Sequence, residues 1–311
     1  MNIMISFNDN YFRMTEVMIY SLFKNHPETE IHVYLLYTNL KPEYMAEFQQ
    51  LFEKFSNKSL HLLSMDSNMH KNVSVTGPYS IESVFRLIGL NLLPADIHRI
   101  LWLDSDIIIN GNLLDLYNTE LSDSPFAVCE DIKAVINCEA DDLKQICGTP
   151  LDRKYFNSGV LLMNLDYIRL HHLDTLIRDV IFAEFENYPL LDQSILNRLF
   201  FDSVTYVPWS LYNVHPLRYM LNLNKLSENR IQFLTYREIN EQSGSEDYKR
   251  NTLDLSEKIR DNARIIHYIG PSKPWLHRNQ EMYITHVPFR HVWEGYEKEL
   301  LSVFPEYQAD W

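Results

Sequence analysis

Two aspartates separated by a single residue follow a short apolar run, and their spacing is the first sign of chemistry in this chain. Asp104 and Asp106 come directly after the apolar residues 100–103, and only Ser105 lies between them. Burying two like charges this close together is costly unless a positive group lies between them. Carboxylate oxygens suit a hard divalent ion, magnesium or manganese, which usually keeps waters or substrate phosphates as its other ligands. Asp-x-Asp alone is common and fits a solvated turn after an edge strand, whereas the apolar residues on both sides of it fit a metal–diphosphate site at the end of a buried strand, so the rest of the chain has to decide between the two.

A second candidate cluster starts at His267, at the end of another short apolar run. A turn containing Gly270 and two prolines follows, and it carries Lys273. Lysine can reach a phosphate, and glycine lets the backbone approach a ligand closely. A lone histidine is more often a core or surface residue than a ligand, but this setting favours His267 as the third ligand of an ion held by Asp104 and Asp106.

The elements that must position these residues alternate between strand and helix through the first hundred residues. Apolar runs predict strands at 2–7, 30–37, 60–65 and 99–103. Helical spacing of apolar residues predicts helices ending near residue 25 and spanning 41–55 and 81–93. This alternation predicts a mostly parallel sheet with helices on both faces, and ligands beyond the carboxyl ends of the strands. The polar cluster 8–11 and the aspartate pair both fall at such ends, so they can share one cleft.

From residue 125 the pattern is less regular. Strands are expected at 126–128, in the run after Tyr155, at 204–208 and at 264–267. Helices are expected at 173–185, at 292–304, and in a segment that starts with Asp192 as its N-cap. Residues 134–150 are expected to form a loop or lid, and 224–261 a polar surface excursion. We expect one domain over 1–275 and a small helical and aromatic extension over 276–311 that packs on it.

The composition excludes several classes of protein. A net charge of −14 argues against nucleic acid as a partner and against a broadly basic membrane-binding face. The eight glycines are scattered and form no Gly-x-Gly pair, so a dinucleotide fingerprint and a P-loop are both absent. A phosphate-bearing ligand would therefore have to be held by a metal and by side chains.

The cellular location of the protein is predicted from its N-terminal segment, its apolar segments and its cysteines. The N-terminus has no signal-peptide pattern, and no segment is long and apolar enough for a transmembrane helix. The three cysteines, Cys129, Cys138 and Cys147, match no zinc spacing, and so small and odd a number indicates a reducing compartment. These features predict a cytoplasmic protein, and they leave peripheral contact with the inner membrane face open.

Four segments, in the same order, resemble the motifs of family 8 glycosyltransferases. They are LWLDSD at 101–106, YFNSGVLLMN at 155–164, LDQSILN at 191–197 and HYIGPSKPW at 267–275. The opening segment NDNY at 8–11 and Arg86 also fit. Each motif is weak alone, but the ordered set is specific. The likeness is strongest to the bacterial lipooligosaccharide galactosyl- and glucosyltransferases, and glycogenin is a more distant relative.

The resemblance implies a GT-A fold, which is an α/β, Rossmann-like mixed sheet flanked by helices. It implies a retaining, metal-dependent enzyme that transfers glucose or galactose from UDP-glucose or UDP-galactose. The acceptor would be a saccharide, on a cell-surface glycan such as lipopolysaccharide or on a glycoprotein. The implied ion is Mn²⁺, with Mg²⁺ as the alternative.

The resemblance also assigns roles by position. The metal ligands would be Asp104, Asp106 and His267. The residues at the nucleotide would be Ser6, Asn8, Asn10, Tyr11, Ser83, Arg86, Ser105, Gly270 and Lys273. The residues around the transferred sugar would be Asp131, Asn157, Asp192 and Gln193, with Asp192 and Gln193 as the catalytic candidates. Because an amide is a poor nucleophile, Gln193 favours same-face attack over a covalent intermediate.

Two departures from the family and two other functions are relevant. Asn8 stands where close relatives carry an acidic residue at the uracil contact, and the tail ends PEYQADW without basic residues. The haloacid-dehalogenase phosphatases also use Asp-x-Asp, but usually on the first strand and with a threonine soon after. A nucleotide-sugar-binding protein without turnover is the other alternative, and the intact set of Asp104, Asp106, His267 and Lys273 argues against it.

Overall fold

The computed structural model describes residues 1–66, 81–131, 144–145, 148–150, 152–184, 188, 190–216, 257–270, 273–275 and 289–307. The loop expected over 134–150 and the excursion expected over 224–261 lie largely outside these residues. Cys138, Cys147 and residues 276–288 of the expected extension also lie outside them.

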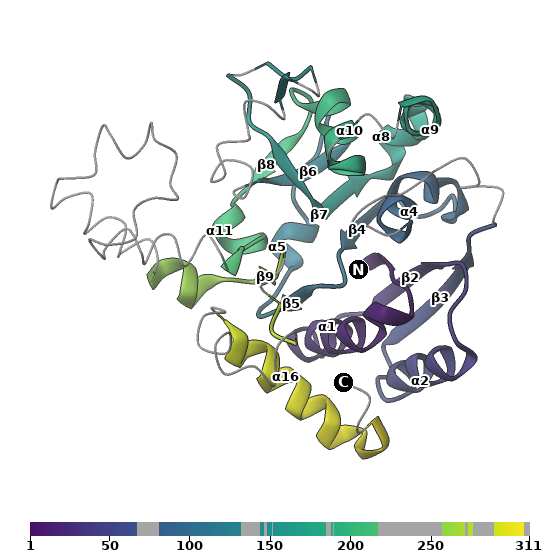
Figure 1. The fold of residues 1–311 in the computed structure, drawn as a ribbon, viewed down its shortest axis with the longest axis vertical. Coiled ribbons are helices and arrows are strands. Elements are labelled where there is room, and N and C mark those ends of the chain that lie inside the picture. Colours follow the sequence, from purple (N-terminus) through teal and green to yellow (C-terminus); the bar gives the residue numbers. More distant parts are fainter. Residues whose placement is uncertain are drawn as a thin grey trace, which may run out of the picture.

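A seven-stranded mixed sheet forms the centre of the molecule, with the strand order β3-β2-β1-β4-β7-β6-β8 (Figure 1). Its strands are β1 Asn2–Ser6, β2 Ile31–Tyr37, β3 Lys58–Ser64, β4 Arg99–Leu103, β6 Phe126–Glu130, β7 Phe156–Asn164 and β8 Thr205–Val207. The first four strands are parallel, β7 is antiparallel to β4 and β6, and β8 is parallel to β6. The expected mixed sheet is therefore confirmed.

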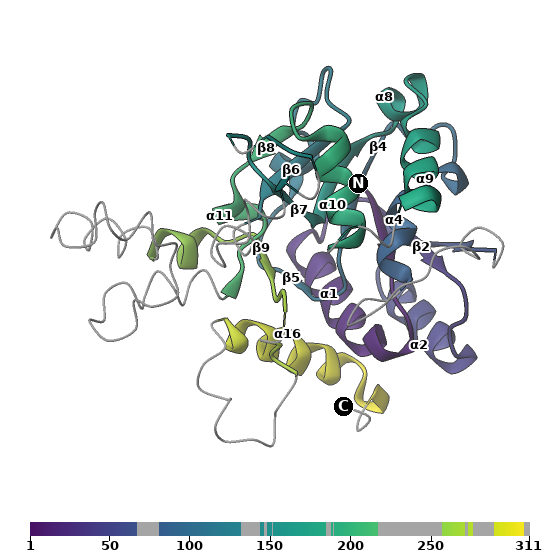
Figure 2. The same cartoon turned by 45° about the horizontal axis from the view of Figure 1, so that its top comes forward.

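Helices cover both faces of the sheet (Figures 1 and 2). Ile3 and Ile5 of β1 face a core formed with α1 Phe12–Asn25, α2 Pro42–Glu53 and α16 Arg290–Val303. Met4 faces a second core formed with α4 Glu82–Ile88, α8 Leu165–Leu170, α9 Leu173–Glu184 and α10 Leu191–Phe200. Successive side chains of a strand point to opposite faces, so burial on both sides explains why these strands are continuously apolar.

A separate pair of short strands was not predicted as such. Strand β5, Ile107–Ile109, pairs antiparallel with β9, Ile265–His267, and the register sets Ile107 opposite His267. Asp106 immediately precedes β5, so this pairing brings the histidine to the aspartate pair from a distant part of the chain.

Two local predictions differ from the structure. The helix expected over 81–93 ends at Ile88, and a 3₁₀ turn, Leu90–Leu92, follows Gly89. The prediction that Asp192 caps its helix is wrong, because α10 starts at Leu191 and its N-cap is Leu190. The carboxylate of Asp192 lies instead beside the guanidinium of Arg86, an interaction that a local capping pattern cannot anticipate.

The C-terminal helix α16 packs on α1 (Figure 1). Trp293 is fully buried, and its ring lies 4.5 Å from that of Trp275 and 6.0 Å from that of Tyr268, measured between centroids. The Tyr268 hydroxyl donates a 2.7 Å hydrogen bond to the Phe289 carbonyl. The division into a domain and an extension at residue 275 stays a prediction. Among the described residues, no helix combines the length and apolar character that crossing a membrane requires.

Helix α1 also buries a carboxylate, that of Glu16. Glu16 is fully buried and lies 2.9 Å from the Arg13 guanidinium, which also contacts Glu47. Burial, followed by the nearby Glu47 charge, raises the pKa of Glu16 to about 8, although Arg13 opposes the shift. The folded protein therefore holds this proton more tightly than the unfolded chain does.

We expect Glu16 to make stability fall as the pH rises. Its ordinary pKa is 4.5 and its folded pKa is about 8, so between these values the unfolded chain has lost a proton that the folded protein keeps. Urea unfolding of the wild type across this window should show stability that decreases and then levels off above it. Glu16→Gln should flatten the profile, whereas Glu299→Gln, at an exposed ion pair, should not. Parallel profiles for wild type and Glu16→Gln would contradict this assignment.

Candidate metal and donor site

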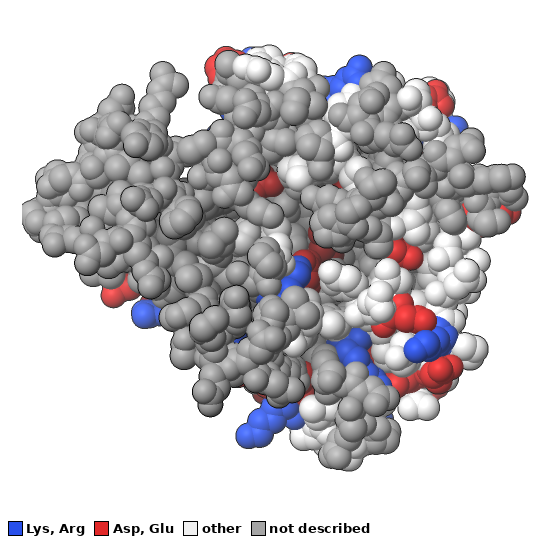
Figure 3. Space-filling model, in the orientation of Figure 1, with Lys and Arg blue, Asp and Glu red and all other residues white. Residues whose placement is uncertain are grey.

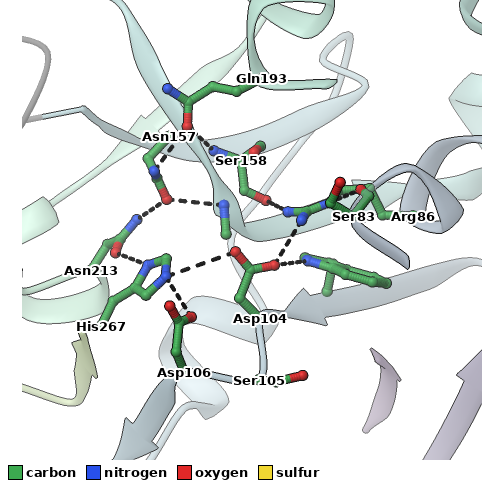
Figure 4. A network of polar contacts seen from close by, with 12 residues as sticks. Ser83, Arg86, Asp104, Ser105, Asp106, Asn157, Ser158, Gln193, Asn213 and His267 are labelled. Atoms are coloured by element: carbon green, nitrogen blue, oxygen red, sulfur yellow. Dashed lines mark hydrogen bonds and ion pairs between the residues drawn. The ribbon is translucent and has the colours of Figure 1, made fainter. Parts of the chain in front are cut away.

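Asp104, Asp106 and His267 converge at the end of β4 (Figure 4). The His267 Nε2 atom lies 3.0 Å from an Asp106 oxygen and 3.7 Å from an Asp104 oxygen. Strand β7 runs beside them, and a Cβ added at Gly159 would come within 2.7 Å of Asp104 Oδ2. Only glycine at this position allows the backbone to pass so close to the cluster.

Cations neutralise both carboxylates. The Arg86 guanidinium lies 2.9 Å from Asp104 Oδ1, which also accepts a 2.8 Å hydrogen bond from the Trp102 indole. The Lys273 ammonium contacts Asp106 directly. Burial alone would raise the pKa of Asp106, but the charge of the Lys273 ammonium, together with the contact with His267, outweighs it and holds that pKa below its ordinary value. Asp106 is therefore ionised although it is partly buried.

The donor atoms fit a divalent ion such as Mn²⁺. One ligand atom from each of Asp104, Asp106 and His267 lies within 4.8 Å of the others. The second ring nitrogen of His267, Nδ1, lies 2.9 Å from the Asn213 amide oxygen. Nδ1 can donate a proton to that oxygen, and the ring then turns Nε2 toward the carboxylates, where a cation would meet it. Two carboxylates and a neutral imidazole make a suitable set for manganese or magnesium.

A cavity of about 150 Å³ lies beside the aspartate pair. It is lined by both aspartates and by six of the predicted nucleotide residues, namely Ser6, Asn8, Tyr11, Ser83, Arg86 and Ser105. Asn10 is exposed and does not line it; its backbone N–H donates to the Asn8 side chain. In the orientation of Figure 1, acidic and basic side chains meet in a hollow near the centre of the view (Figure 3).

The residues predicted at the sugar also lie together. Asn157 donates a 2.9 Å hydrogen bond to the Gln193 amide oxygen, and Gln193 donates a 2.7 Å bond to Asp131. Asp192 lies 3.3 Å from Arg86. Burial raises the pKa of Asp192; Arg86 opposes the shift and Asp104 adds to it. Arg86 thus bridges the metal candidate Asp104 and the catalytic candidate Asp192.

Three residues at the site escaped the sequence analysis. Glu82 lines the cavity and accepts a 3.2 Å hydrogen bond from Asn8, which brings a carboxylate beside the unusual asparagine. Trp102 supports Asp104, and Asn213 contacts His267. Glu82 directly precedes the assigned residue Ser83, and Trp102 lies two residues before Asp104 within the LWLDSD motif, so their positions in the sequence were a signal. Asn213 had no such signal.

A model of the family described as glycosyl transferase family 8 matches residues 2–279. A lipopolysaccharide 1,2-glucosyltransferase of Escherichia coli is 25% identical over 278 residues, which is 88% of this chain and 73% of that protein. General stress protein A of Bacillus subtilis is 23% identical and covers 91% and 90% of the two chains.

The solved structure of the galactosyltransferase LgtC in complex with donor and acceptor sugar analogues is also similar. Its TM-score is 0.70 at 24% identity, and the match covers 96% of each chain. At this identity the match shows the fold, and it confirms the GT-A type expected from the motifs.

We expect Asp106→Ala to abolish binding of Mn²⁺. Removing a direct ligand should lower the affinity for Mn²⁺ by at least ~100-fold, since loss of a residue that only supports a ligand already lowers metal affinity by ~10–100-fold. Isothermal titration of Mn²⁺ without nucleotide measures this. Asp166→Ala is the matched control, because Asp166 also pairs with a histidine, His98, at 2.9 Å on the exposed surface. Wild-type affinity in Asp106→Ala would refute the metal assignment.

Proposed function

The chain belongs to glycosyl transferase family 8, and from this premise we propose that it transfers glucose or galactose from a UDP-sugar to a saccharide, with retention at the anomeric carbon. The observation that carries the proposal is the convergence of Asp104, Asp106 and His267 beside the cavity at the strand ends. The similar LgtC was solved with donor and acceptor sugar analogues, and the Escherichia coli relative is named for lipopolysaccharide, which supports a cell-surface glycan as the acceptor.

The metal would be Mn²⁺, with Mg²⁺ as the alternative, and Asp104, Asp106 and His267 would hold it. When bound, the ion supplies Lewis-acid stabilisation of the negative charge on the departing diphosphate. Lys273 adds a second positive group at the same place, since its ammonium already reaches Asp106. Gly270 has a φ of 76°, a conformation that favours glycine and lets the backbone approach the diphosphate closely.

The uridine would lie in the cavity between β1 and α4. Ser105 already donates its hydroxyl proton to the Ser6 carbonyl at 3.1 Å, so its oxygen can accept a hydrogen bond from a ribose hydroxyl, and it can donate to the ribose only after this bond is exchanged. Asn8 and Glu82 together present an amide and a carboxylate, the groups that pair with the N–H and carbonyl of a uracil edge.

On the sugar side, Gln193 and Asp192 would act on the reacting centre by charge and position. The amide oxygen of Gln193 already accepts hydrogen bonds from Asn157 and from the Ser158 backbone, at 2.9 and 3.2 Å. An oxygen engaged in this way is a weak nucleophile, which supports same-face attack over a covalent intermediate. Asp192 would supply negative charge to the cationic sugar, while Arg86 keeps that carboxylate in place.

The reaction would take place in the cytoplasm, with peripheral contact at the inner face of the membrane where a lipid-linked acceptor is presented. The net charge of −14 argues against contact through a broad basic face, so a local surface would have to make this contact. We further propose that residues 1–275 form the transferase domain and that 276–311 pack on it.

A panel of nucleotide sugars tests the donor and the metal together. We expect the protein to release UDP slowly from UDP-glucose or UDP-galactose in the presence of Mn²⁺, and not from ADP-glucose or after chelation of the metal. Coupled detection of free UDP measures this hydrolysis without knowledge of the acceptor. Tight UDP-sugar binding without any release, in the presence of saccharide acceptors, would identify a binding protein. Turnover of p-nitrophenyl phosphate would identify a phosphatase.

We expect Lys273→Ala to weaken UDP binding while the fold is retained. Losing one charge-assisted contact to a phosphate should cost about 1.5–3 kcal/mol, or ~10–100-fold in Kd. Titration of UDP in Mn²⁺ measures the affinity, and thermal unfolding checks the fold. Lys24→Ala is the control, because Lys24 forms a lysine–carboxylate pair with Glu299 on exposed surface. Unchanged UDP affinity in Lys273→Ala would count against its role at the diphosphate.

A further inference from the structure

Asn213 links the metal candidates to the sugar candidates, and no role has yet been assigned to it. It follows α11, Trp209–Tyr212, and its side chain is buried. Its amide oxygen lies 2.9 Å from His267 Nδ1, and its amide nitrogen lies 2.9 Å from the Asn157 oxygen (Figure 4). Figure 4 shows the Asn213 side chain between those of His267 and Asn157.

Backbone donors fix the orientation of these amides. The oxygen and nitrogen of an asparagine amide are normally assigned from their partners. Here the Gly159 backbone N–H donates to Asn157 Oδ1 at 2.9 Å, so that atom is an acceptor. The group of Asn213 that faces it must therefore be the NH₂, and the Asn213 oxygen faces His267. His267 then has to donate from Nδ1.

The same logic holds at the far end of the chain of bonds. The Ser158 backbone N–H donates to Gln193 Oε1 at 3.2 Å, which turns the Gln193 NH₂ toward Asp131. Asn157 donates to the same Gln193 oxygen. All four side-chain bonds therefore run in one direction, in the order His267, Asn213, Asn157, Gln193, Asp131.

A one-way chain of this kind acts on the metal ligand. Each bond polarises the next, and the chain ends on a carboxylate. The imidazole is held as the Nδ1–H tautomer, its ring orientation is fixed, and Nε2 becomes a better electron donor toward the aspartate pair. Without an acceptor at Nδ1, the ring could rotate or carry its proton on Nε2, which cannot then bind a cation.

We propose that Asn213 is a positioning residue that fixes the tautomer and orientation of His267 for metal binding and connects this ligand to the donor-sugar pocket through Asn157. The proposal rests on the proposed function, because it takes the ion at Asp104, Asp106 and His267 as given. It adds a residue outside the ligand set, and it identifies the imidazole nitrogen, and not the carboxylates, as the part of the site that Asn213 controls.

The experiment compares two ions in Asn213→Ala. Isothermal titration without nucleotide should show Mn²⁺ bound ~10–100-fold more weakly than in the wild type, the usual effect of losing a ligand's supporting residue. Binding of Mg²⁺ should fall much less, because Mg²⁺ prefers oxygen ligands and depends less on the imidazole. General loosening of the site would weaken both ions alike, and that result would overturn the proposal.

A double-mutant cycle shows whether Asn213 acts through His267. In a His267→Ala background, Asn213→Ala should cause no further loss of Mn²⁺ affinity, because the group it positions is already gone. Additive losses would overturn the proposal. This readout does not require catalytic activity, and failure of the wild type itself to bind Mn²⁺ would refute the metal site and the proposed function with it.

Two further variants separate positioning from folding. Asn213→Asp keeps an acceptor for His267 Nδ1, so its Mn²⁺ affinity should stay closer to the wild-type value than that of Asn213→Ala. Asn25→Ala removes an amide that also bridges elements, with bonds to Ser21, Ile109 and Tyr296, but it should leave Mn²⁺ affinity unchanged. An equal loss in Asn213→Asp and Asn213→Ala, or a loss in Asn25→Ala, would overturn the positioning role.

Discussion

Neutralisation of two neighbouring, partly buried carboxylates is the constraint on which the rest of this structure depends. Asp104 and Asp106 would repel each other, and the cost of burying them is offset only by positive or proton-donating groups. The Trp102 indole of β4 donates to Asp104, positive charge comes from Arg86 on α4 and from Lys273 in the turn after β9, and His267 of β9 lies beside both carboxylates. The elements that carry them must therefore meet at the end of β4.

Several contacts fix the polar side chains that surround the two aspartates. Arg86 donates to the Ser83 carbonyl at 2.8 Å and contacts the Ser158 carbonyl, and its guanidinium lies 4.6 Å from the Trp102 ring centroid. It is therefore a fixed part of the site. The chain of bonds from His267 to Asp131 is fixed in the same way by backbone donors. Both arrangements hold ligand and sugar candidates in position before any substrate binds, which is the condition for electrostatic catalysis.

The C-terminal helix contributes to the same region through aromatic packing. Tyr268 directly follows His267, and Trp275 lies two residues after Lys273 in the chain. Both rings pack against Trp293 of α16. The helix therefore supports the strand and turn that deliver a metal candidate and a diphosphate candidate, although it contains none of the assigned site residues.

The sequence by itself determined the parts of this protein that depend on local pattern. It predicted the early strands and helices to within a few residues, the aspartate pair at the end of β4, and, through the ordered motifs, the family and the GT-A fold. Only the tertiary structure decided that β7 runs antiparallel, that β5 pairs with β9 so that His267 faces the aspartates, and that Asn213 lies behind the histidine. It also decided that Asp192 pairs with Arg86 and does not cap its helix. Periodicity and capping act between neighbours along the chain, whereas these contacts join distant segments and are fixed by packing and charge compensation, which no local pattern encodes.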